Sequence, residues 1–378
     1  MYRVLFLLLP MVLMADLKVG LGVVDITPGA GVPSAGYAAR RGEPMEGTRD
    51  PLYASAIMID NGEKRVALCS VDHLGFTYQM CQAVAREFPF DVIIGSTHTH
   101  SGGGAFLNIP RLGPFLAGAF SPQVTQGYVD GAILAINRAL DTMQDAQIGV
   151  GLGHVEGVSY FRASCPAIEP IDHLTLIKIV DAKGDPLAGL VNFALHPTVL
   201  KADNRYFSAD FVASVRDKVQ FPLIYFNGAQ AEVIPVQGKS CDQIGEAIAG
   251  EVIRLWEGTE VKNDLKLALA RRPLTFQPEV NPSGIRLPVE SYASEVGALQ
   301  LGDWLFSLVP GELSVAYEMD LRREFDKVAV LGLTGDAHGY LIKPEAWDSK
   351  TMESRMSFGG REHGDWIYSL LRDCLREL

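Results

Sequence analysis

The sequence predicts a mixed α and β fold in which mixed central β-sheets are flanked by helices. Runs of β-branched and other apolar residues, each about the length of a strand, recur along the whole chain. Four segments instead place apolar residues at every third or fourth position, as amphipathic helices do. The predicted strands come in pairs as well as in alternation with helices, so a simple doubly wound parallel sheet fits their order poorly.

The predicted elements follow one another in a definite order. The first four strands lie at 17–25, 53–60, 65–72 and 91–96, and the next four at 146–155, 174–181, 187–195 and 222–228. Three more strands are predicted at 265–272, 298–309 and 328–335. Helical periodicity is found at 76–88, 121–144, 241–257 and 313–325. Two segments rich in Gly and Pro, 26–51 and 101–120, are long loops, and loops of that length are usually functional or disordered.

The composition is that of an ordinary globular protein, with 48% hydrophobic and 21% charged residues in 378. A net charge of -12 without clustered Lys and Arg argues against a surface for nucleic acid or anionic membranes. The five cysteines are scattered and form no C-x-x-C motif, so they make neither a disulfide scaffold nor a redox motif. No repeat or linker divides the chain. We therefore expect one domain over 16–378, and we infer no protein partner.

The first 15 residues, MYRVLFLLLPMVLMA, combine a basic residue, a compact apolar run and a final alanine. This is the outline of a secretory signal peptide, and the run is too short for a transmembrane span. Translation from Met14 is the alternative start, because the domain would then begin directly at its first strand. The first interpretation predicts a secreted or periplasmic protein and the second a cytoplasmic one.

The stretch GSTHTHSGGG places His98 and His100 two residues apart, just after the strand predicted at 91–96. Residues two apart on an extended segment point to the same side, so both imidazoles can face one cavity. Imidazole is the commonest metal ligand but also a common surface group, and the motif alone favours neither role. The glycines at 102–104 would allow a ligand to approach the backbone closely, so Gly102 and Gly103 are candidate substrate-binding positions.

Three further polar residues follow predicted strands far apart in the sequence: His196, Glu312 and Tyr340. Each has an ordinary alternative role, as a buried histidine bonded to backbone, a partner of a helix dipole or an interface tyrosine. Folds often assemble catalytic sites from the ends of distant strands. Two histidines, a carboxylate and one more oxygen would suit Zn²⁺ in an open hydrolytic site, whereas structural zinc sites use local Cys-rich spacing that is absent from this sequence.

With these residues in place, the chain resembles the neutral/alkaline (non-lysosomal) ceramidase family, specifically its N-terminal catalytic domain. The matching motifs occur in the family's order over nearly the whole chain: GVVDITP (22–28), DPLYASA (50–56), GSTHTHSGGG (95–104), NFALHPT (192–198), FSAD (207–210), NGAQAEVIP (227–235), VPGE (309–312) and HGYLI (338–342). The sequence ends shortly after the last motif, so the family's C-terminal immunoglobulin-like domain is expected to be missing.

The resemblance implies one zinc ion per chain, held by His98, His196, Glu312 and Tyr340. It implies that the second histidine of the pair, His100, lies beside the zinc near the scissile amide. It also implies that an arginine reaches the site, for which Arg162 in YFRAS is the counterpart.

Two positions depart from the family's pattern. The serine of its G-D-V-S-P-N segment, which carries an essential catalytic role there, corresponds to Ile234, and a second tyrosine is absent around Met356. An aliphatic side chain supplies no hydroxyl nucleophile, so a serine-ester mechanism through this position is excluded.

These observations predict a zinc-dependent hydrolase of an N-acyl (amide) linkage in a small molecule or lipid, with zinc-activated water as the nucleophile and His100, Arg162 and Tyr340 as catalytic groups. The alternatives are a zinc hydrolase of the same fold acting on another small amide or ester, and an inactive zinc-containing binding protein. Asp210 is expected either to orient a ligand such as His196 or to begin a helix. Asp25 and Asp72 are expected to be structural.

Overall fold

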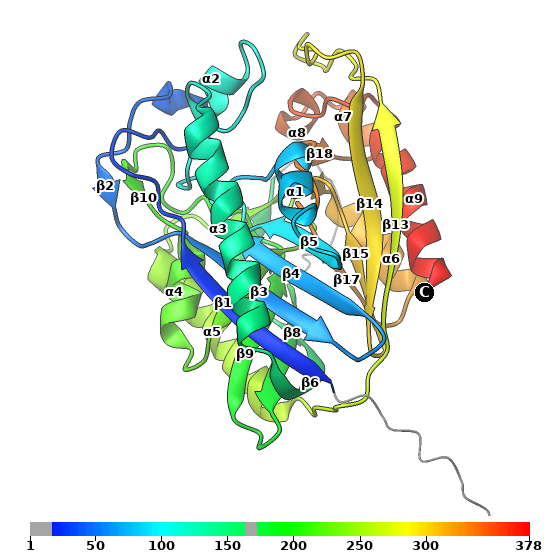
Figure 1. Cartoon of the computed structure of the whole chain (residues 1–378). Helices are drawn as coiled ribbons and strands as arrows, with labels where there is room; N and C mark the ends of the chain where they lie inside the picture. The colour runs from blue at the N-terminus through cyan, green and yellow to red at the C-terminus, as the bar shows by residue number, and fades with distance from the viewer. Residues whose placement is uncertain (1–16, 163–171) are drawn as a thin grey trace, which may run out of the picture.

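The computed structural model describes residues 17–162 and 172–378, and it places two β-sheets face to face between layers of helices (Figure 1). The segment with the predicted signal peptide, 1–15, lies outside the described residues. The predicted class, mixed sheets flanked by helices, is confirmed. Within the described ranges no helix combines the length and the apolar character that crossing a membrane requires.

The first sheet has eight strands in the order β11 (Leu223–Asn227), β9 (Pro186–Phe193), β8 (His173–Asp181), β6 (Gln144–His154), β1 (Lys18–Asp25), β3 (Tyr53–Asp60), β4 (Arg65–Val71) and β5 (Asp91–Ser96). The second has four, in the order β13 (Leu267–Phe276), β14 (Tyr292–Leu301), β15 (Trp304–Leu308) and β17 (Val328–Leu331). In the first sheet the two edge pairs, β9 with β11 and β4 with β5, are parallel, and the pairs between them are antiparallel.

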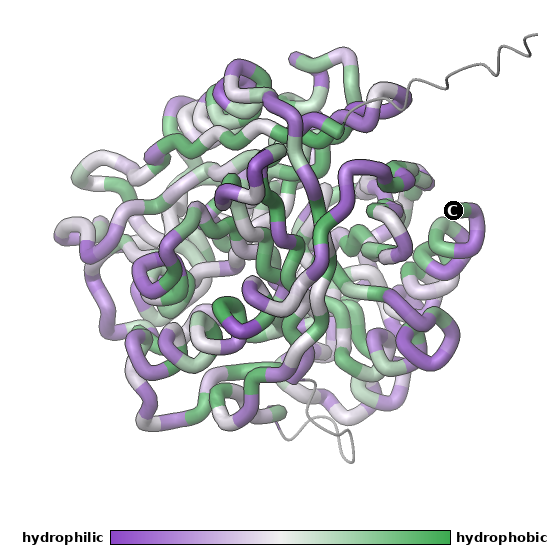
Figure 2. The backbone as a smooth tube through the Cα atoms, turned by 90° about the horizontal axis from the view of Figure 1, so that it is seen from below, coloured by the Kyte–Doolittle hydropathy of each residue, from purple (hydrophilic) through white to green (hydrophobic). Residues whose placement is uncertain are grey.

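Helices cover the outer face of each sheet (Figure 1). On the first sheet these are α1 (Tyr78–Ala85), α3 (Pro122–Asp141), α4 (Phe211–Lys218) and α5 (Cys241–Gly258). On the second they are α6 (Val315–Glu324) and α9 (His363–Glu377). Shorter helices, α2 (Gly113–Ala117), α7 (Pro344–Asp348) and α8 (Met352–Arg355), lie in the connections. Many of the hydrophilic stretches lie on loops at the periphery (Figure 2).

The alternation of side chains along β1 shows how the layers form. Val19 and Leu21 point toward the second sheet, where they join an apolar core that also contains Phe306. Gly20 and Gly22 point the other way, toward α3. A Cβ atom on Gly20 would lie 1.9 Å from the carbonyl oxygen of Ala139 in α3. The absence of side chains at these two positions therefore lets the helix lie directly on the strand.

The main differences from the predictions lie at one strand and two helices. The strand predicted at 298–309 is a hairpin of β14 and β15, because Gly302, with φ of 61°, turns the chain after Leu301. The helices α4 and α9 were not predicted. The buried residues Ile367, Leu371, Cys374 and Leu375 of α9 are three or four positions apart, so the segment does have a helical period, although most of its other residues are polar.

Three two-stranded ladders carry chain segments toward one end of the sheets. The strands β16 (Glu312–Leu313) and β18 (Tyr340–Leu341) are parallel partners, and β12 (Val233–Pro235) is antiparallel to β7 (Ser159–Phe161). The third ladder joins β2 (Gly47–Thr48) and β10 (Tyr206–Phe207). The first two bring together segments more than 20 residues apart, and both contribute to the site described next.

Candidate active site

Four segments meet where β5 and β9 end. His98 follows β5 and His196 follows β9. Glu312 and Tyr340 are register partners in the β16–β18 ladder, which places them side by side. Buried Asn227 joins the two strand ends, because its side-chain amide lies 3.0 Å from the carbonyl oxygens of both Thr97 and Leu195 and donates to them.

Backbone carbonyls fix the orientation of two imidazoles. Nδ1 of His98 lies 2.6 Å from the carbonyl oxygen of Leu74, and Nδ1 of His196 lies 2.9 Å from that of Val233. A proton on each Nδ1 therefore leaves the Nε2 lone pair free. Both Nε2 atoms point at the same carboxylate oxygen, Oε2 of Glu312, at 3.4 Å from His98 and 2.9 Å from His196.

The backbone at His98 is strained. Its φ is 68°, in the left-handed region that residues with a side chain rarely adopt. The backbone amide of His98 donates to the carbonyl oxygen of His73 at 3.0 Å. Such conformations persist only where the surroundings hold them, and they concentrate at functional sites. The neighbours of His98 thus fix its backbone as well as its ring.

The Glu312 carboxylate is the negative centre of the site. Burial raises its pKa, but the adjacent His98 and His196 outweigh burial and hold the pKa of Glu312 well below its usual range. Burial, opposed by Glu312, lowers the pKa of His196. The site therefore combines an ionised Glu312 carboxylate with a neutral His196 imidazole, and these are the protonation states in which the two groups bind a metal.

His100 approaches the same point from the other side. Its Nε2 lies 3.2 Å from Nε2 of His98, and ligand atoms of His98, His100 and His196 all lie within 4.8 Å of one another. Burial, together with His98 and His196, holds the pKa of His100 well below its ordinary value. Nδ1 of His100 is buried and has no hydrogen-bond partner among the described residues. The ring is therefore neutral, with Nε2 directed at His98 and Nδ1 unbonded.

Buried Arg40 holds the loop that carries His100. Its guanidinium donates to the carbonyl oxygen of His100, to the hydroxyl of Ser34 at 2.5 Å and to the carbonyl oxygen of Lys201 at 2.8 Å. Edge-on contact with the ring of Tyr37, at 4.9 Å between centroids, supports the imidazole itself. Sequence reasoning missed Arg40, Tyr37 and Asn227, because no motif in the sequence indicates which distant carbonyls a buried side chain reaches.

Tyr340 and Arg162 form the opposite wall. The Tyr340 hydroxyl lies 3.4 Å from Nε2 of His196 and accepts a hydrogen bond from Arg162 at 3.2 Å. Arg162 also donates to the carbonyl oxygen of Ala231 and pairs through Nε with Glu353 at 2.8 Å. Burial and the nearby Glu312 raise the pKa of Tyr340, so its hydroxyl is neutral and can donate.

The arrangement fits a divalent metal ion of the zinc type. Zinc prefers imidazole nitrogen and carboxylate oxygen, and its histidine ligands commonly donate their second N–H to a carbonyl. Both features are present at His98 and His196, and Glu312 supplies the carboxylate. The residues predicted as ligands, His98, His196, Glu312 and Tyr340, thus lie close together in the structure. His100 and Arg162 lie beside them.

The candidate substrate-binding glycines pack tightly. A Cβ atom on Gly103 would lie 2.0 Å from the Tyr128 hydroxyl, and one on Gly102 would lie 3.0 Å from Cγ2 of Thr99. Close packing therefore requires glycine at Gly103, whereas at Gly102 a side chain would need only a small shift of its neighbours. Their role in substrate binding stays a prediction.

Asp210 lies at the start of α4 as its N-cap. Its carboxylate accepts from the backbone amides of Phe211, Val199 and Leu200 at 2.8, 3.2 and 3.0 Å. The group that orients the His196 ring is the Val233 carbonyl, not this carboxylate. Of the two roles expected from the sequence, Asp210 has the second: it begins a helix. Its carboxylate also holds the loop that follows His196, through the amides of Val199 and Leu200.

The two positions that depart from the family pattern both lie near the site. Ile234 pairs with Tyr160 in the β12–β7 ladder, one residue after the carbonyl that binds His196. Met356 packs against a small apolar cluster that contains Tyr340. Apolar side chains therefore occupy the two positions at which the family pattern has hydroxyl groups.

Glu232 is a buried carboxylate outside this cluster. It accepts from the backbone amide of Val315 at 3.1 Å, and burial raises its pKa from 4.5 to about 7. The folded protein therefore holds this proton more tightly than the unfolded chain does. As the pH rises from about 4.5 to about 7, this residue lowers the free energy of unfolding by about 3 kcal/mol.

Replacing Glu232 with glutamine removes the ionisation, so we expect E232Q to gain stability relative to wild type as the pH rises. Urea unfolding of both metal-free proteins at pH 5 and pH 8 measures this. The difference between variant and wild type should move in favour of E232Q by up to about 3 kcal/mol at pH 8. An equal difference at the two pH values would show that Glu232 titrates normally.

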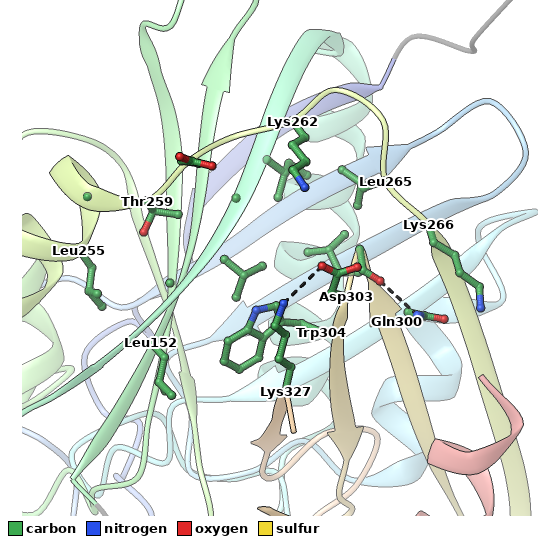
Figure 3. Close-up of a pocket in the computed structure, with 18 of the residues that line it drawn as sticks. Leu152, Leu255, Thr259, Lys262, Leu265, Lys266, Gln300, Asp303, Trp304 and Lys327 are labelled. Atoms are coloured by element: carbon green, nitrogen blue, oxygen red, sulfur yellow. Dashed lines mark hydrogen bonds and ion pairs between the residues drawn. The ribbon is translucent and has the colours of Figure 1, made fainter. Parts of the chain in front are cut away.

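A cavity of about 620 Å³ lies elsewhere, between β6, the segment after α5 and the β14–β15 hairpin (Figure 3). Its wall includes Trp304, and Lys327 pairs across it with Asp303 at 3.3 Å. The histidines, Glu312 and Tyr340 do not line this cavity. Its lysines and carboxylates nearly balance in charge, so it provides no distinct chemistry.

Comparisons with known proteins identify the relatives of this chain. The model of the family described as "Neutral/alkaline non-lysosomal ceramidase, N-terminal" matches residues 17–216. The chain is 27% identical over 217 residues to the neutral ceramidase of Pseudomonas aeruginosa and 26% identical over 217 residues to neutral ceramidase A of Dictyostelium discoideum. Each alignment covers 51% of this chain, but only 32% and 30% of those proteins. The chain thus spans about a third of the length of these curated relatives.

Solved structures show the same fold over nearly the whole chain. The crystal structure of the Pseudomonas aeruginosa neutral ceramidase superposes with a TM-score of 0.83 and 17% identity, covering 96% of this chain and 74% of that one. A structure described as "Ceramidase complexed with C2" gives a TM-score of 0.85 and 16% identity, covering 96% and 76%. Because the family model matches more than half of its 378 residues, the chain belongs to the neutral/alkaline non-lysosomal ceramidase family.

Proposed function

We propose that the protein is a zinc-dependent amidohydrolase that cleaves an N-acyl linkage of ceramide type. The observation that carries this proposal is the convergence of two imidazole Nε2 atoms, each fixed by a backbone carbonyl, on one buried carboxylate oxygen of Glu312. In the proposal, one zinc ion per chain is held by His98, His196 and Glu312, with Tyr340 as the fourth ligand. Zinc, when bound, supplies a water of near-neutral pKa and polarises the amide carbonyl.

The residues around the proposed ligands have separate tasks. His100, whose Nε2 faces the site at 3.2 Å from Nε2 of His98, accepts the proton of the attacking water at that nitrogen and passes it to the leaving amine. Arg162 directs its guanidinium to the Tyr340 hydroxyl, and these two donors stabilise the negative charge that develops on the carbonyl oxygen. Ile234 offers no hydroxyl, so water and not a side chain is the nucleophile.

Turnover assays with the purified full chain test the reaction and its substrate together. We expect hydrolysis of labelled ceramide or of short N-acyl amides, and we expect a strong chelator to lower it by at least about a hundredfold until zinc is restored. Hydrolysis of the short amides alone would assign a substrate other than ceramide, in keeping with the aliphatic side chains of Ile234 and Met356. Absence of turnover on every substrate at full zinc occupancy would overturn the proposed activity and favour a binding protein.

A further inference from the structure

A second group of metal-binding side chains lies where β6 ends and β8 begins. His154 is the last residue of β6, His173 is the first residue of β8, and the two are direct partners in this antiparallel pair. Direct partners project from the same face of a sheet, and the two imidazole rings lie 4.7 Å apart between centroids. Asp172 directly precedes His173 in the chain.

The potential ligand atoms of these three residues converge. Nδ1 of His154 lies 2.9 Å from Oδ1 of Asp172, and one ligand atom from each of the three residues falls within 4.8 Å of the others. These separations are short enough for one ion to contact all three. The side chain of His154 is 55% exposed and that of Asp172 is 24% exposed, so solvent can supply further ligands.

An ordinary surface ion pair accounts for only two of the three groups. The contact between His154 and Asp172 is such a pair. His173 lies beside it, but its Nδ1 is buried and has no hydrogen-bond partner among the described residues. Buried polar nitrogens are nearly always bonded, so an unpartnered one beside an imidazole and a carboxylate calls for a ligand.

The charges around His173 favour the neutral, metal-binding form of its ring. Burial, and next the nearby Arg322, lower its pKa, while Glu318 raises it more weakly. Glu318 is itself buried in α6, with Oε1 bonded to Arg322 and Oε2 lacking a partner among the described residues. An imidazole that stays neutral near pH 7 can bind a metal without first losing a proton.

We propose that His154, Asp172 and His173 form a second metal site, which takes a divalent transition-metal ion of the zinc type and leaves open positions toward solvent. Two imidazoles with one carboxylate are a donor set that suits zinc and its neighbours and not the all-oxygen preference of calcium or magnesium. The site shares no residue with the cluster of His98, His100, His196 and Glu312. It ties together the ends of two strands, so binding should also stabilise the fold.

Zinc titration of a variant that lacks the first cluster isolates this site. In the H98A/H196A variant of the full chain, stripped of metal, competition with a chromogenic chelator should report one bound equivalent of Zn²⁺. Adding H154N or D172N to that background should weaken the affinity by at least about tenfold, because either change removes one of three protein ligands. Zn²⁺ should also raise the melting temperature of the H98A/H196A protein, and should not do so in the added variants.

Asp145 provides the matched control. It is an exposed carboxylate on the same strand, β6, and pairs with Lys18 at 3.6 Å, so D145N changes the net charge as D172N does without touching the cluster. D145N should keep the affinity of its parent. If H98A/H196A proves unstable, H154N and D172N can each be made in the otherwise wild-type chain. Each should then remove one of two equivalents of Zn²⁺, and D145N should remove none. Equal affinity in D172N, H154N and D145N, or no equivalent bound to H98A/H196A, would overturn the second site.

Discussion

Replacing His98 with alanine is expected to remove both the bound zinc and hydrolytic activity, whereas H100A should keep the zinc and lose activity alone. His98 directs Nε2 at the Glu312 carboxylate with its ring fixed by the Leu74 carbonyl, which is the arrangement of a ligand. Because the metal supplies the nucleophile in the proposed mechanism, H98A should lower kcat/KM on the order of a thousandfold or more. Loss of a proton-transfer group at His100 should lower kcat by about a hundredfold to ten-thousandfold.

Zinc analysis of the purified variants, with kcat and KM measured on one N-acyl substrate, separates these roles. Because the proposed second site would hold zinc in every protein, D172N serves as the background in which one equivalent remains to be counted. H196A is the parallel for H98A, since its ring meets Glu312 at 2.9 Å. Loss of zinc in H100A would instead make His100 a ligand, in line with the 3.2 Å distance between its Nε2 and that of His98. Retention of zinc in both H98A and H196A would contradict the assigned centre.

The sequence predicted the members of the site better than their partners. His98, His196 and Glu312 were each recognisable as polar residues at the ends of apolar runs, and the structure brings all three together. The strand runs were recognisable because burial on both faces leaves continuous apolar segments. Asn227 also ends an apolar run, but that pattern does not indicate its partners. Its bonds to Thr97 and Leu195 depend on two strand ends meeting, and single-sequence patterns do not report that contact.

Some errors in the predicted fold arose although the sequence held the signal. The hairpin at Gly302 was predicted as one strand because apolar runs flank Gly302 and Asp303 on both sides, yet a Gly-Asp pair between two such runs is typical of a hairpin turn. Helix α9 packs through Ile367, Leu371 and Cys374, whose spacing of three or four residues is a helical period. Asp72 and Asp25 looked alike in the sequence, as acids after apolar strands, yet the structure buries the first and exposes the second.

Asp72 is expected to be the more important of these two acids for stability. Its fully buried carboxylate binds both terminal nitrogens of Arg216 in α4, at 2.5 and 3.0 Å, and accepts from the backbone amide of Tyr53 at 2.9 Å. D72A would leave the Arg216 guanidinium largely buried without a counter-charge. Breaking a buried pair in this way costs about 3–5 kcal/mol, a large part of the stability of an ordinary domain.

Urea unfolding of metal-free D72A and D25A at one pH measures the contrast. Asp25 is exposed and accepts from the backbone amide of Thr27 at 2.8 Å, so D25A should change the free energy of unfolding by no more than about 1 kcal/mol. A double variant, D72A/R216M, should recover part of the loss, because it removes both charges together. Similar losses of unfolding free energy in D72A and D25A would show that the buried Asp72–Arg216 pair contributes no more to stability than an exposed carboxylate does.

The same substitution should also disturb the candidate active site. Asp72 directly precedes His73, whose carbonyl oxygen accepts from the strained backbone amide of His98 at 3.0 Å. Because that strain persists only while its neighbours hold it, D72A should weaken zinc binding as well as folding, although it removes no ligand. Zinc affinity measured at a temperature where D72A is still folded tests this link. An unchanged affinity would mean that the loop holds His98 without the Asp72–Arg216 pair.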